Sequence, residues 1–385
     1  MASTQTPTAC LPPTRTPVTT TLRAALHHAT PALLAYTGVR TTGLLALTLW
    51  SHLRDQNVWQ ALAAEWDTEW YLGIAAHGYT TELGTRQDAN NLAFFPLYPL
   101  LLRALTPASP LSPASTGLTL AIAASLLAAW GIFAIGDHLH GRRVGILLTT
   151  LWAALPVGLV QWMGYTESLF TACAAWSLYA VLTGRWLAAA TLAALAGLTR
   201  PTGIAVAAAV TVTALTSSRH PRALLAALLA PLGWLGYVGW VGLRLDRWDG
   251  YFAVQRLWRN DWDGGVRTVE QLRHLLFEDS TPELFLLMVT GTLLASVALF
   301  ALSLADRQPL PLLVFTGVML AIVLGSGGVY FPRARFLLPA FPLLLPLALH
   351  LSRASRRLRT LALTGAVLGS AYCGAYMILV WPSAP

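Results

Sequence analysis

The sequence predicts an all-α, polytopic integral membrane protein of about eleven transmembrane helices. The chain has 385 residues, of which 55% are hydrophobic and only 11% charged, whereas soluble domains contain about 25% charged residues. Its long apolar runs approach the roughly 20 residues that cross a bilayer. Because lipid offers no hydrogen-bond partner to an open strand edge, the spanning segments are expected to be helices.

The apolar runs divide the chain into spans and connections. They lie near residues 31–50, 117–136, 144–162, 168–183, 186–198, 201–216, 223–243, 284–304, 309–328, 336–351 and 360–381. Several are shorter than a full span, so the count of eleven is approximate. We expect the Pro- and Thr-rich residues 1–28 to form a disordered cytoplasmic tail without a cleavable signal peptide, and residues 29–385 to form one transmembrane domain.

The distribution of charge assigns the two sides of the membrane. Arginines cluster on alternate connections, for example at Arg142 and Arg143, which the positive-inside rule places in the cytoplasm. Two long outer loops, at about 51–116 and 244–283, carry most of the acids, and only Asp137 and Asp306 lie on the cytoplasmic side. Any chemistry is therefore expected on the outer face. The net charge of +8 reflects this topology, and no nucleic-acid partner is expected.

Composition also suggests the source and the role of the cysteines. The chain is rich in Ala and Leu and contains no Lys, which is typical of GC-rich bacterial genomes. We therefore predict a multi-pass protein of the bacterial cytoplasmic membrane, with its site facing the periplasm or the exterior. Cys10, Cys173 and Cys373 are scattered without metal or disulfide spacing, so they are expected to be inert.

Residues 66–71 place two carboxylates among three aromatic rings, after the first long apolar run. Ionisable groups beside a bilayer are costly and usually functional. The spacing predicts a short surface helix in which Asp67 is available for acid–base chemistry and Trp66, Trp70 and Tyr71 shape a sugar site. Glu69 lies two residues from Asp67 and should point elsewhere, toward an acceptor at most. The alternative is an interfacial aromatic belt that only anchors the loop.

Four further motifs are candidates for the same outer site. The Pro-rich residues 90–100 predict a re-entrant or interfacial turn that presents Asn91 and Tyr98 to a cavity, or else a kinked lead-in to the next span. The turn at 164–170 places Tyr165 and Glu167 at the outer mouth of a span. There Thr166 or Ser168 could alternatively cap the following helix.

The third motif is Arg200, which precedes Pro201 between two short apolar runs. A turn at cavity depth would deliver its guanidinium to the site, whereas a snorkelling Arg in an ordinary hairpin is the alternative. The fourth is the pair Arg333 and Arg335, at an outer end where the positive-inside rule does not explain positive charge. We interpret these arginines as phosphate ligands, against the alternative of solvation among lipid headgroups.

The second outer loop has amphipathic character, consistent with a segment that lies on the membrane and covers a groove. We include its Gln255 among the expected substrate-binding residues. Asp261 and Asp263 resemble a metal-ligand pair, but no further oxygen ligands accompany them. No metal site and no firm cofactor are therefore predicted, with a divalent cation as a minor alternative.

Five of these motifs, in order along residues 60–345, resemble the PIG-V-like mannosyltransferases. These are relatives of GPI mannosyltransferase 2 within the GT-C superfamily of membrane glycosyltransferases. The matching pieces are WD..WY..IA..GY from Trp66, FFPLYP from Phe94, YTESLF from Tyr165, LTRPTG from Leu198 and RFLLP from Arg335. Each motif is weak alone, and the five in family order are fairly specific.

The resemblance implies a GT-C-type fold whose large first outer loop carries a catalytic aspartate, at the position of Asp67. It also implies a sugar donor, mannose in the family, on a polyprenyl phosphate, and inversion at the anomeric carbon. The partners would be this donor, a lipid or glycan acceptor and the membrane lipids. Asp67 would then accept the acceptor's hydroxyl proton, while Arg335, Arg333 and Arg200 stabilise the departing phosphate.

Two alternatives remain open. One is a secondary transporter of an anionic solute whose path is lined by the same arginines; broken helices in corresponding halves would favour it. The sequence shows one clear break, at Arg200 and Pro201, and no matching break in the second half. The other is a GT-C enzyme of different specificity, acting on protein or an envelope polymer.

Overall fold

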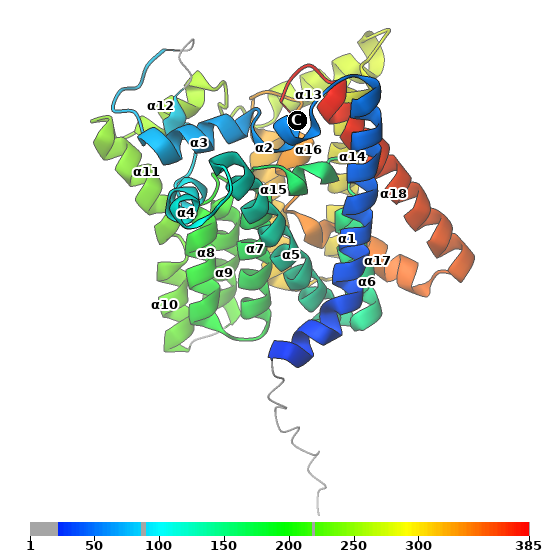
Figure 1. Ribbon diagram of the computed structural model, residues 1–385. Coiled ribbons are helices and arrows are strands. Elements are labelled where there is room, and N and C mark those ends of the chain that lie inside the picture. Colours follow the sequence, from blue (N-terminus) through cyan, green and yellow to red (C-terminus); the bar gives the residue numbers. More distant parts are fainter. Residues whose placement is uncertain (1–21, 86–89, 218–219, 385) are drawn as a thin grey trace, which may run out of the picture.

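The computed structural model describes residues 22–85, 90–217 and 220–384. Over these residues the regular structure is helical, and the one strand-like pairing is an isolated antiparallel bridge between Trp262 and Ser326 (Figure 1). The predicted all-α class is confirmed. The predicted boundary of the tail at residue 28 is wrong, because helix α1 already begins at Leu22. The first turns of α1 contact α5 (Pro113–His140), where His28 Nε2 lies 3.0 Å from Asp137 Oδ2. Residues 1–21 of the predicted tail lie outside the described residues.

Five segments of the described chain are long and apolar enough to cross a membrane, judged by length and composition. They are α1 (Leu22–Leu53), α5 (Pro113–His140), the pair α10 (Pro221–Leu229) and α11 (Leu232–Arg244), α14 (Leu284–Ala305), and α18 (Arg356–Leu379).

The remaining apolar runs form shorter helices. They are α6 (Arg142–Ala153), η3 (Gly158–Trp162), α7 (Glu167–Leu182), α8 (Trp186–Gly197), α9 (Gly203–Ser217), α15 (Leu310–Gly325), α16 (Arg333–Phe336), η5 (Phe341–Leu344) and α17 (Leu345–Arg353). Each of the eleven predicted runs thus contains helix, but several are too short to cross a bilayer alone.

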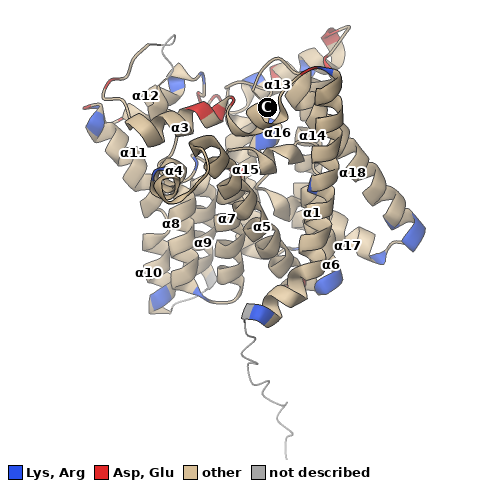
Figure 2. Cartoon of the chain, viewed as in Figure 1, with Lys and Arg blue, Asp and Glu red and all other residues tan. Residues whose placement is uncertain are grey.

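Short helices from the two outer loops cover one end of the bundle. They are α2 (Val58–Ala63), α3 (Asp67–His77), η1 (Asn91–Ala93), α4 (Leu97–Leu105), η2 (Thr106–Ala108), α12 (Gly250–Leu257), α13 (Val266–Arg273) and the π-helical η4 (His274–Glu278). Figure 2 shows the acidic residues gathered at this end, whereas arginines mark the opposite ends of α1, α6, α10 and α18. The two ends of the bundle therefore differ in charge, and which end faces the exterior stays a prediction.

Small residues let the helices of the core approach closely. Ala is the commonest buried residue of α5, α7, α8 and α9, and small residues are common where helices pack within a membrane. At Gly233 of α11, an added Cβ would collide with the backbone of Ala194 in α8. The neighbouring Trp234 donates its indole N–H to Pro201 O at 2.9 Å, which ties α11 to the turn between α8 and α9.

The helices of the bundle are interrupted at three places near the outer layer, which is the set of short helices from the two outer loops. The chain leaves regular α-helix at residues 154–166, at 198–202, and on either side of the short α16 at 326–332 and 337–344, and proline occurs at all three places. The sequence showed one of these breaks clearly, at Arg200 and Pro201, whereas the structure has further breaks on both sides of it. Proline lacks the N–H that continues a helix, and here clustered prolines create short helical turns where the sequence suggested longer spans. The three breaks deliver Glu167, Arg200 and Arg335 to one place.

Candidate active site

Asp67 is the first residue of α3, at the surface of the outer layer. The preceding residue, Trp66, has φ 60, a backbone conformation that a bulky side chain rarely adopts. Neighbouring contacts hold the start of the helix in place: Thr68 Oγ1 donates to Gly164 O at 3.3 Å, and Gly164 N donates to Leu62 O at 2.8 Å. These contacts fix Asp67 beside the turn that precedes α7.

Arg335 joins Asp67 to a second, deeper carboxylate. Its Nη2 lies 2.9 Å from Asp67 Oδ2, and its Nε lies 3.3 Å from Glu167 Oε1. The guanidinium also packs over the ring of Tyr165, 5.0 Å from the centroid. Arg335 is 5% exposed and Glu167 is 0% exposed, whereas Asp67 keeps 21% of its side chain accessible. Of the two acids, only Asp67 is open to an incoming molecule.

Arg200 completes the cluster from the turn between α8 and α9. Its Nη1 lies 2.7 Å from Glu167 Oε1 and donates to Thr166 Oγ1 at 2.9 Å. The same Thr166 oxygen lies 3.0 Å from the hydroxyl of Tyr71, one helical turn after Asp67. The expected cap by Thr166 is wrong, because its hydroxyl accepts from Arg200 and makes no capping bond to α7. A continuous chain of polar contacts thus runs from α3 through α7 and Arg200 to Arg335 and back to α3.

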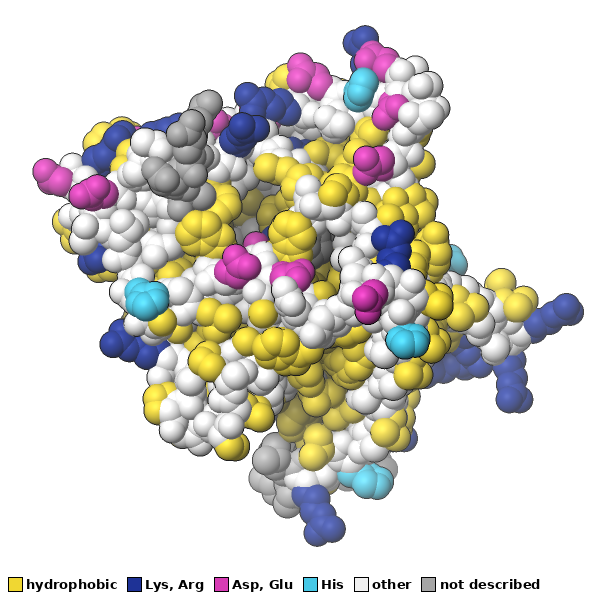
Figure 3. All heavy atoms as spheres, turned by 45° about the horizontal axis from the view of Figure 1, so that its top comes forward, with side chains coloured by type: hydrophobic (Ala, Val, Ile, Leu, Met, Phe, Trp, Pro, Cys, Tyr) yellow, Lys and Arg dark blue, Asp and Glu magenta, His cyan; other side chains and the backbone are white. Residues whose placement is uncertain are grey.

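These groups open into a cavity of about 220 Å³. Asp67, Tyr71, Arg200 and Arg335 line it, together with Phe94, Phe95, Gln255, Trp258, Asn260 and Phe336. Seen from the outer side, the molecule is hollowed near its middle, with acidic and hydrophobic side chains at the rim (Figure 3). The arrangement combines one accessible carboxylate, two buried guanidinium groups and an aromatic wall.

The aromatic wall is assembled from both outer loops. The Trp70 ring stacks on Phe94 with 5.5 Å between centroids, and Trp258 meets both rings edge-on. Trp258 Nε1 donates to Asn90 O at 3.0 Å, and the hydroxyl of Tyr237 donates to Phe94 O at 2.8 Å. The second outer loop therefore packs against the first and closes one side of the cavity. Such rings offer flat apolar faces against which a sugar can stack.

Tyr71 is held as a neutral phenol. Burial raises the pKa of its hydroxyl, and the negative charge of Asp67 adds to the effect. A neutral phenol can donate a hydrogen bond but is a poor acceptor of a proton near neutral pH. This leaves the Asp67 carboxylate as the group of the cavity suited to accept a proton.

Arg333 is not part of this cluster. Its Nη2 donates to Ser326 O at 2.5 Å and Gly328 O at 3.3 Å, and its Nη1 donates to Thr268 Oγ1. It lines a neighbouring cavity of about 310 Å³, which Arg200, Gln255 and Phe336 also line. Its contacts in this structure brace the chain before α16 against α13.

Several other predicted residues lie behind the cavity or outside it. The Asn91 side chain pairs with Gly78 O and Thr80 N at 3.1 Å each, and Tyr98 is fully buried and donates to Gly117 O at 2.8 Å. Tyr165 is buried beneath Arg335, and Trp66 and Glu69 are exposed. None of these residues lines the cavity. Gln255 does, with its amide linked to the Tyr251 hydroxyl at 2.8 Å and to Asn260 at 3.2 Å.

Sequence reasoning missed four residues that build the site: Thr166, Trp258, Asn260 and Phe336. Thr166 and Phe336 adjoin Glu167 and Arg335 in their motifs, but the sequence suggested only a helix cap for Thr166 and no role for Phe336. The ring of Phe336 packs against two guanidinium groups: Cζ of Arg200 lies 5.6 Å and Cζ of Arg335 lies 5.3 Å from the ring centroid. Nothing in the sequence indicated that Asn260 would reach the cavity.

Among the described residues, no three of His, Cys, Asp and Glu gather as a metal-binding group. Asp263 instead accepts hydrogen bonds from the backbone of Gly265 at 2.8 Å and Arg267 at 3.1 Å, at the start of α13. Its carboxylate therefore stabilises a helix terminus.

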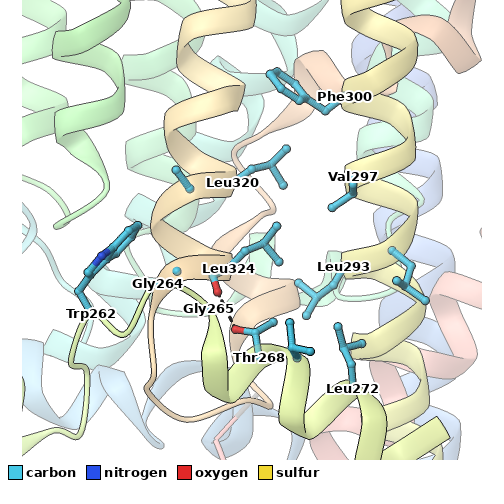
Figure 4. Close-up of a pocket in the computed structure, with 14 residues that line it drawn as sticks. Trp262, Gly264, Gly265, Thr268, Leu272, Leu293, Val297, Phe300, Leu320 and Leu324 are labelled. Carbon is cyan, nitrogen blue, oxygen red and sulfur yellow. Dashed lines mark hydrogen bonds between the residues drawn. The ribbon is translucent and has the colours of Figure 1, made fainter.

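A separate cavity of about 500 Å³ lies between α13, α14 and α15 (Figure 4). Leu293, Val297 and Leu320 line it, and Thr268 donates its hydroxyl to Leu324 O at 2.6 Å beside it. No ionisable side chain lines this cavity. It offers no group for acid–base chemistry, so the cavity at Asp67 is the candidate active site.

No protein-family model matches the sequence, and no curated protein matches it. The fold is similar to the crystal structure of ArnT from Cupriavidus metallidurans bound to undecaprenyl phosphate, with a TM-score of 0.56 and 14% sequence identity. The likeness covers 88% of this chain and 63% of ArnT, so the chain spans less than two thirds of that protein's length. At this identity the likeness shows the fold alone, a helical arrangement similar to that of ArnT.

Proposed function

We propose that this protein is a membrane glycosyltransferase. It transfers a sugar, mannose by its resemblance to the PIG-V-like family, from a polyprenyl-phosphate donor to a lipid or glycan acceptor on the outer face of a bacterial cytoplasmic membrane. The observation that carries the proposal is the 2.9 Å contact between Asp67 and Arg335, at a cavity shared with Arg200. The GT-C-type fold and its similarity to a structure that binds undecaprenyl phosphate support the same chemistry.

Asp67 is proposed as the general base. The acceptor's hydroxyl gives its proton to the Asp67 carboxylate as its oxygen forms a bond to the anomeric carbon. The bond from that carbon to the phosphate oxygen breaks on the opposite face, which inverts the anomeric configuration. Proton transfer to a placed base typically contributes about 10²- to 10⁴-fold in rate.

Arg335 and Arg200 are proposed to receive the leaving phosphate. Both guanidinium groups are buried, so their attraction to an anion is screened less than in water. Arg335 Nη1 has no hydrogen-bond partner within the described part of the chain and retains a donor for a phosphate oxygen. Phosphate leaves as a stable anion, so the step needs no general acid. Phe94, Trp258 and Gln255 then provide the walls and a polar group for the sugar.

Transfer of label from a defined donor tests this function. The purified protein in liposomes is given radiolabelled undecaprenyl-phosphate mannose with a panel of lipid and glycan acceptors. We expect labelled product whose anomeric configuration, measured by NMR, is opposite to that of the donor. Flux of an anionic solute into the liposomes, without transfer of label, would instead indicate a transporter.

A further inference from the structure

Glu167 carries the ionic contacts of the site without reaching the cavity. The residue is 0% exposed and is absent from the cavity lining. A single one of its two carboxylate oxygens, Oε1, contacts both arginines: it lies 2.7 Å from Arg200 Nη1 and 3.3 Å from Arg335 Nε. A substrate in the cavity would meet the two guanidinium groups in front of it. The expected substrate-binding role of Glu167 therefore has no direct route in this arrangement.

The two arginines need a counter-charge to lie together. Both pack against the ring of Phe336, 5.6 Å and 5.3 Å from its centroid, and both are almost completely buried. Like charges so close repel strongly where water is excluded. The shared oxygen of Glu167 offsets this repulsion and fixes both groups to the start of α7.

We propose that Glu167 is a positioning residue for the transfer. It aligns Arg200 and Arg335 for the donor phosphate, and it shares Arg335 with Asp67 so that this guanidinium does not pair with Asp67 alone. This inference rests on the proposed function and assigns Glu167 a role without substrate contact.

The electrostatic surroundings of Asp67 make the role measurable. Arg335 faces Asp67 from α16, Tyr165 from the turn before α7 and Tyr71 from the next turn of α3. Glu167 and Arg200 lie within electrostatic range of Tyr71. In Glu167→Gln, Arg335 pairs with Asp67 alone and one negative charge disappears. Deprotonated Asp67 is then favoured but is a weaker base. The net positive charge facing the donor phosphate increases.

The test compares the wild type, Glu167→Gln and the exposed control Glu82→Gln in liposomes. For Glu167→Gln we expect kcat to fall about tenfold and the acid limb of the kcat/KM profile to move to lower pH, because a negative charge near the base is removed. We expect the Kd for undecaprenyl phosphate, measured by tryptophan fluorescence, not to weaken. Glu82→Gln should match the wild type in all three quantities.

Other outcomes overturn the inference in distinct ways. A lower kcat with an unmoved acid limb would indicate a purely structural role, and a tenfold weaker Kd with unchanged kcat would indicate direct contact with the donor. Should Glu167→Gln not fold, Glu167→Asp keeps the charge and should lower kcat with the acid limb in place; a shifted limb there contradicts the proposal. A wild type that binds the lipid but transfers no sugar would refute the proposed function itself.

Discussion

Arg335 Nη2 lies 2.9 Å from Asp67 Oδ2, although the two residues come from opposite ends of the sequence. Asp67 begins a surface helix of the first outer loop, and Arg335 belongs to a short helical turn between α15 and α17. The contact therefore depends on the whole fold. It also supports the roles proposed for the two groups, because an accessible carboxylate can take a proton while a buried guanidinium attracts an anion.

Replacement of Arg335 by Lys should separate charge from geometry. Lys keeps a positive charge beside Asp67 and Glu167, so it avoids the cost of about 3–5 kcal/mol for leaving a buried charge unpaired. It loses the planar fork that holds two carboxylates and a phosphate together. We expect transfer to fall about 100-fold with little loss of thermal stability. Arg256→Lys, in an exposed ion pair with Asp249, is the matched control and should remain active.

Thr166→Val should loosen the cluster without changing any charge. The hydroxyl of Thr166 links Arg200 to Tyr71 at 2.9 Å and 3.0 Å, and Val has nearly the same shape. Buried partners left without a hydrogen bond should lower the free energy of unfolding by about 1–3 kcal/mol. We also expect weaker binding of undecaprenyl phosphate, measured by fluorescence titration. Thr183→Val removes only hydrogen bonds to Tyr179 O and Ala180 O in the last turn of α7, and an equal effect there would count against the cluster.

Two glycines of α11 test the packing that supports Arg200. In Gly233→Ala the new Cβ would meet the backbone of Ala194, whereas in Gly236→Ala it meets nothing within 4 Å. Overpacking typically costs about 1–3 kcal/mol, so Gly233→Ala should melt at a lower temperature in detergent. Gly236→Ala should be neutral or stabilising by up to about 1 kcal/mol. Equal melting temperatures for both variants would contradict the close approach of α8 and α11.

Arg333→Lys should affect stability more than donor binding. Its guanidinium is held by Ser326 O, Gly328 O and Thr268 Oγ1, away from the contact between Asp67 and Arg335. We expect a lower melting temperature and a Kd for undecaprenyl phosphate within about threefold of the wild type. If Arg333→Lys weakened the binding of undecaprenyl phosphate as much as Arg335→Lys does, Arg333 would have to be counted among the phosphate ligands.

The sequence predicted the fold class and the central residues of the site for physical reasons. Apolar runs reveal helices in a membrane, and isolated charges such as Asp67, Arg200 and Arg335 stand out against them because they are costly there. The breaks around Arg200 followed from Pro201. The extent of the other breaks could not be predicted, because several prolines are tolerated within helical turns and only tertiary packing decides which of them interrupt a span.

Helix geometry explains why some residues that are neighbours in the sequence, and were predicted to act together, lie apart in the structure. Arg333 and Arg335 are two residues apart on one helical turn, and positions i and i+2 do not face each other. The same spacing turns Glu69 away from Asp67, whereas Tyr71, four residues on, shares its face and lines the cavity. Asn91 and Tyr98 lie in the predicted region, but their polar atoms are used by the backbone of the outer loop and of α5.

Asp67→Asn tests the central claim most directly, with Asp55→Asn as a matched control. Asp55 is exposed on the first outer loop at φ 56, a conformation that Asn also tolerates. We expect Asp67→Asn to lose at least about 100-fold in label transfer while it still binds undecaprenyl phosphate, and Asp55→Asn to transfer at the wild-type rate. An Asp67→Asn protein that transfers sugar as fast as the wild type would contradict the assignment of Asp67 as the catalytic base.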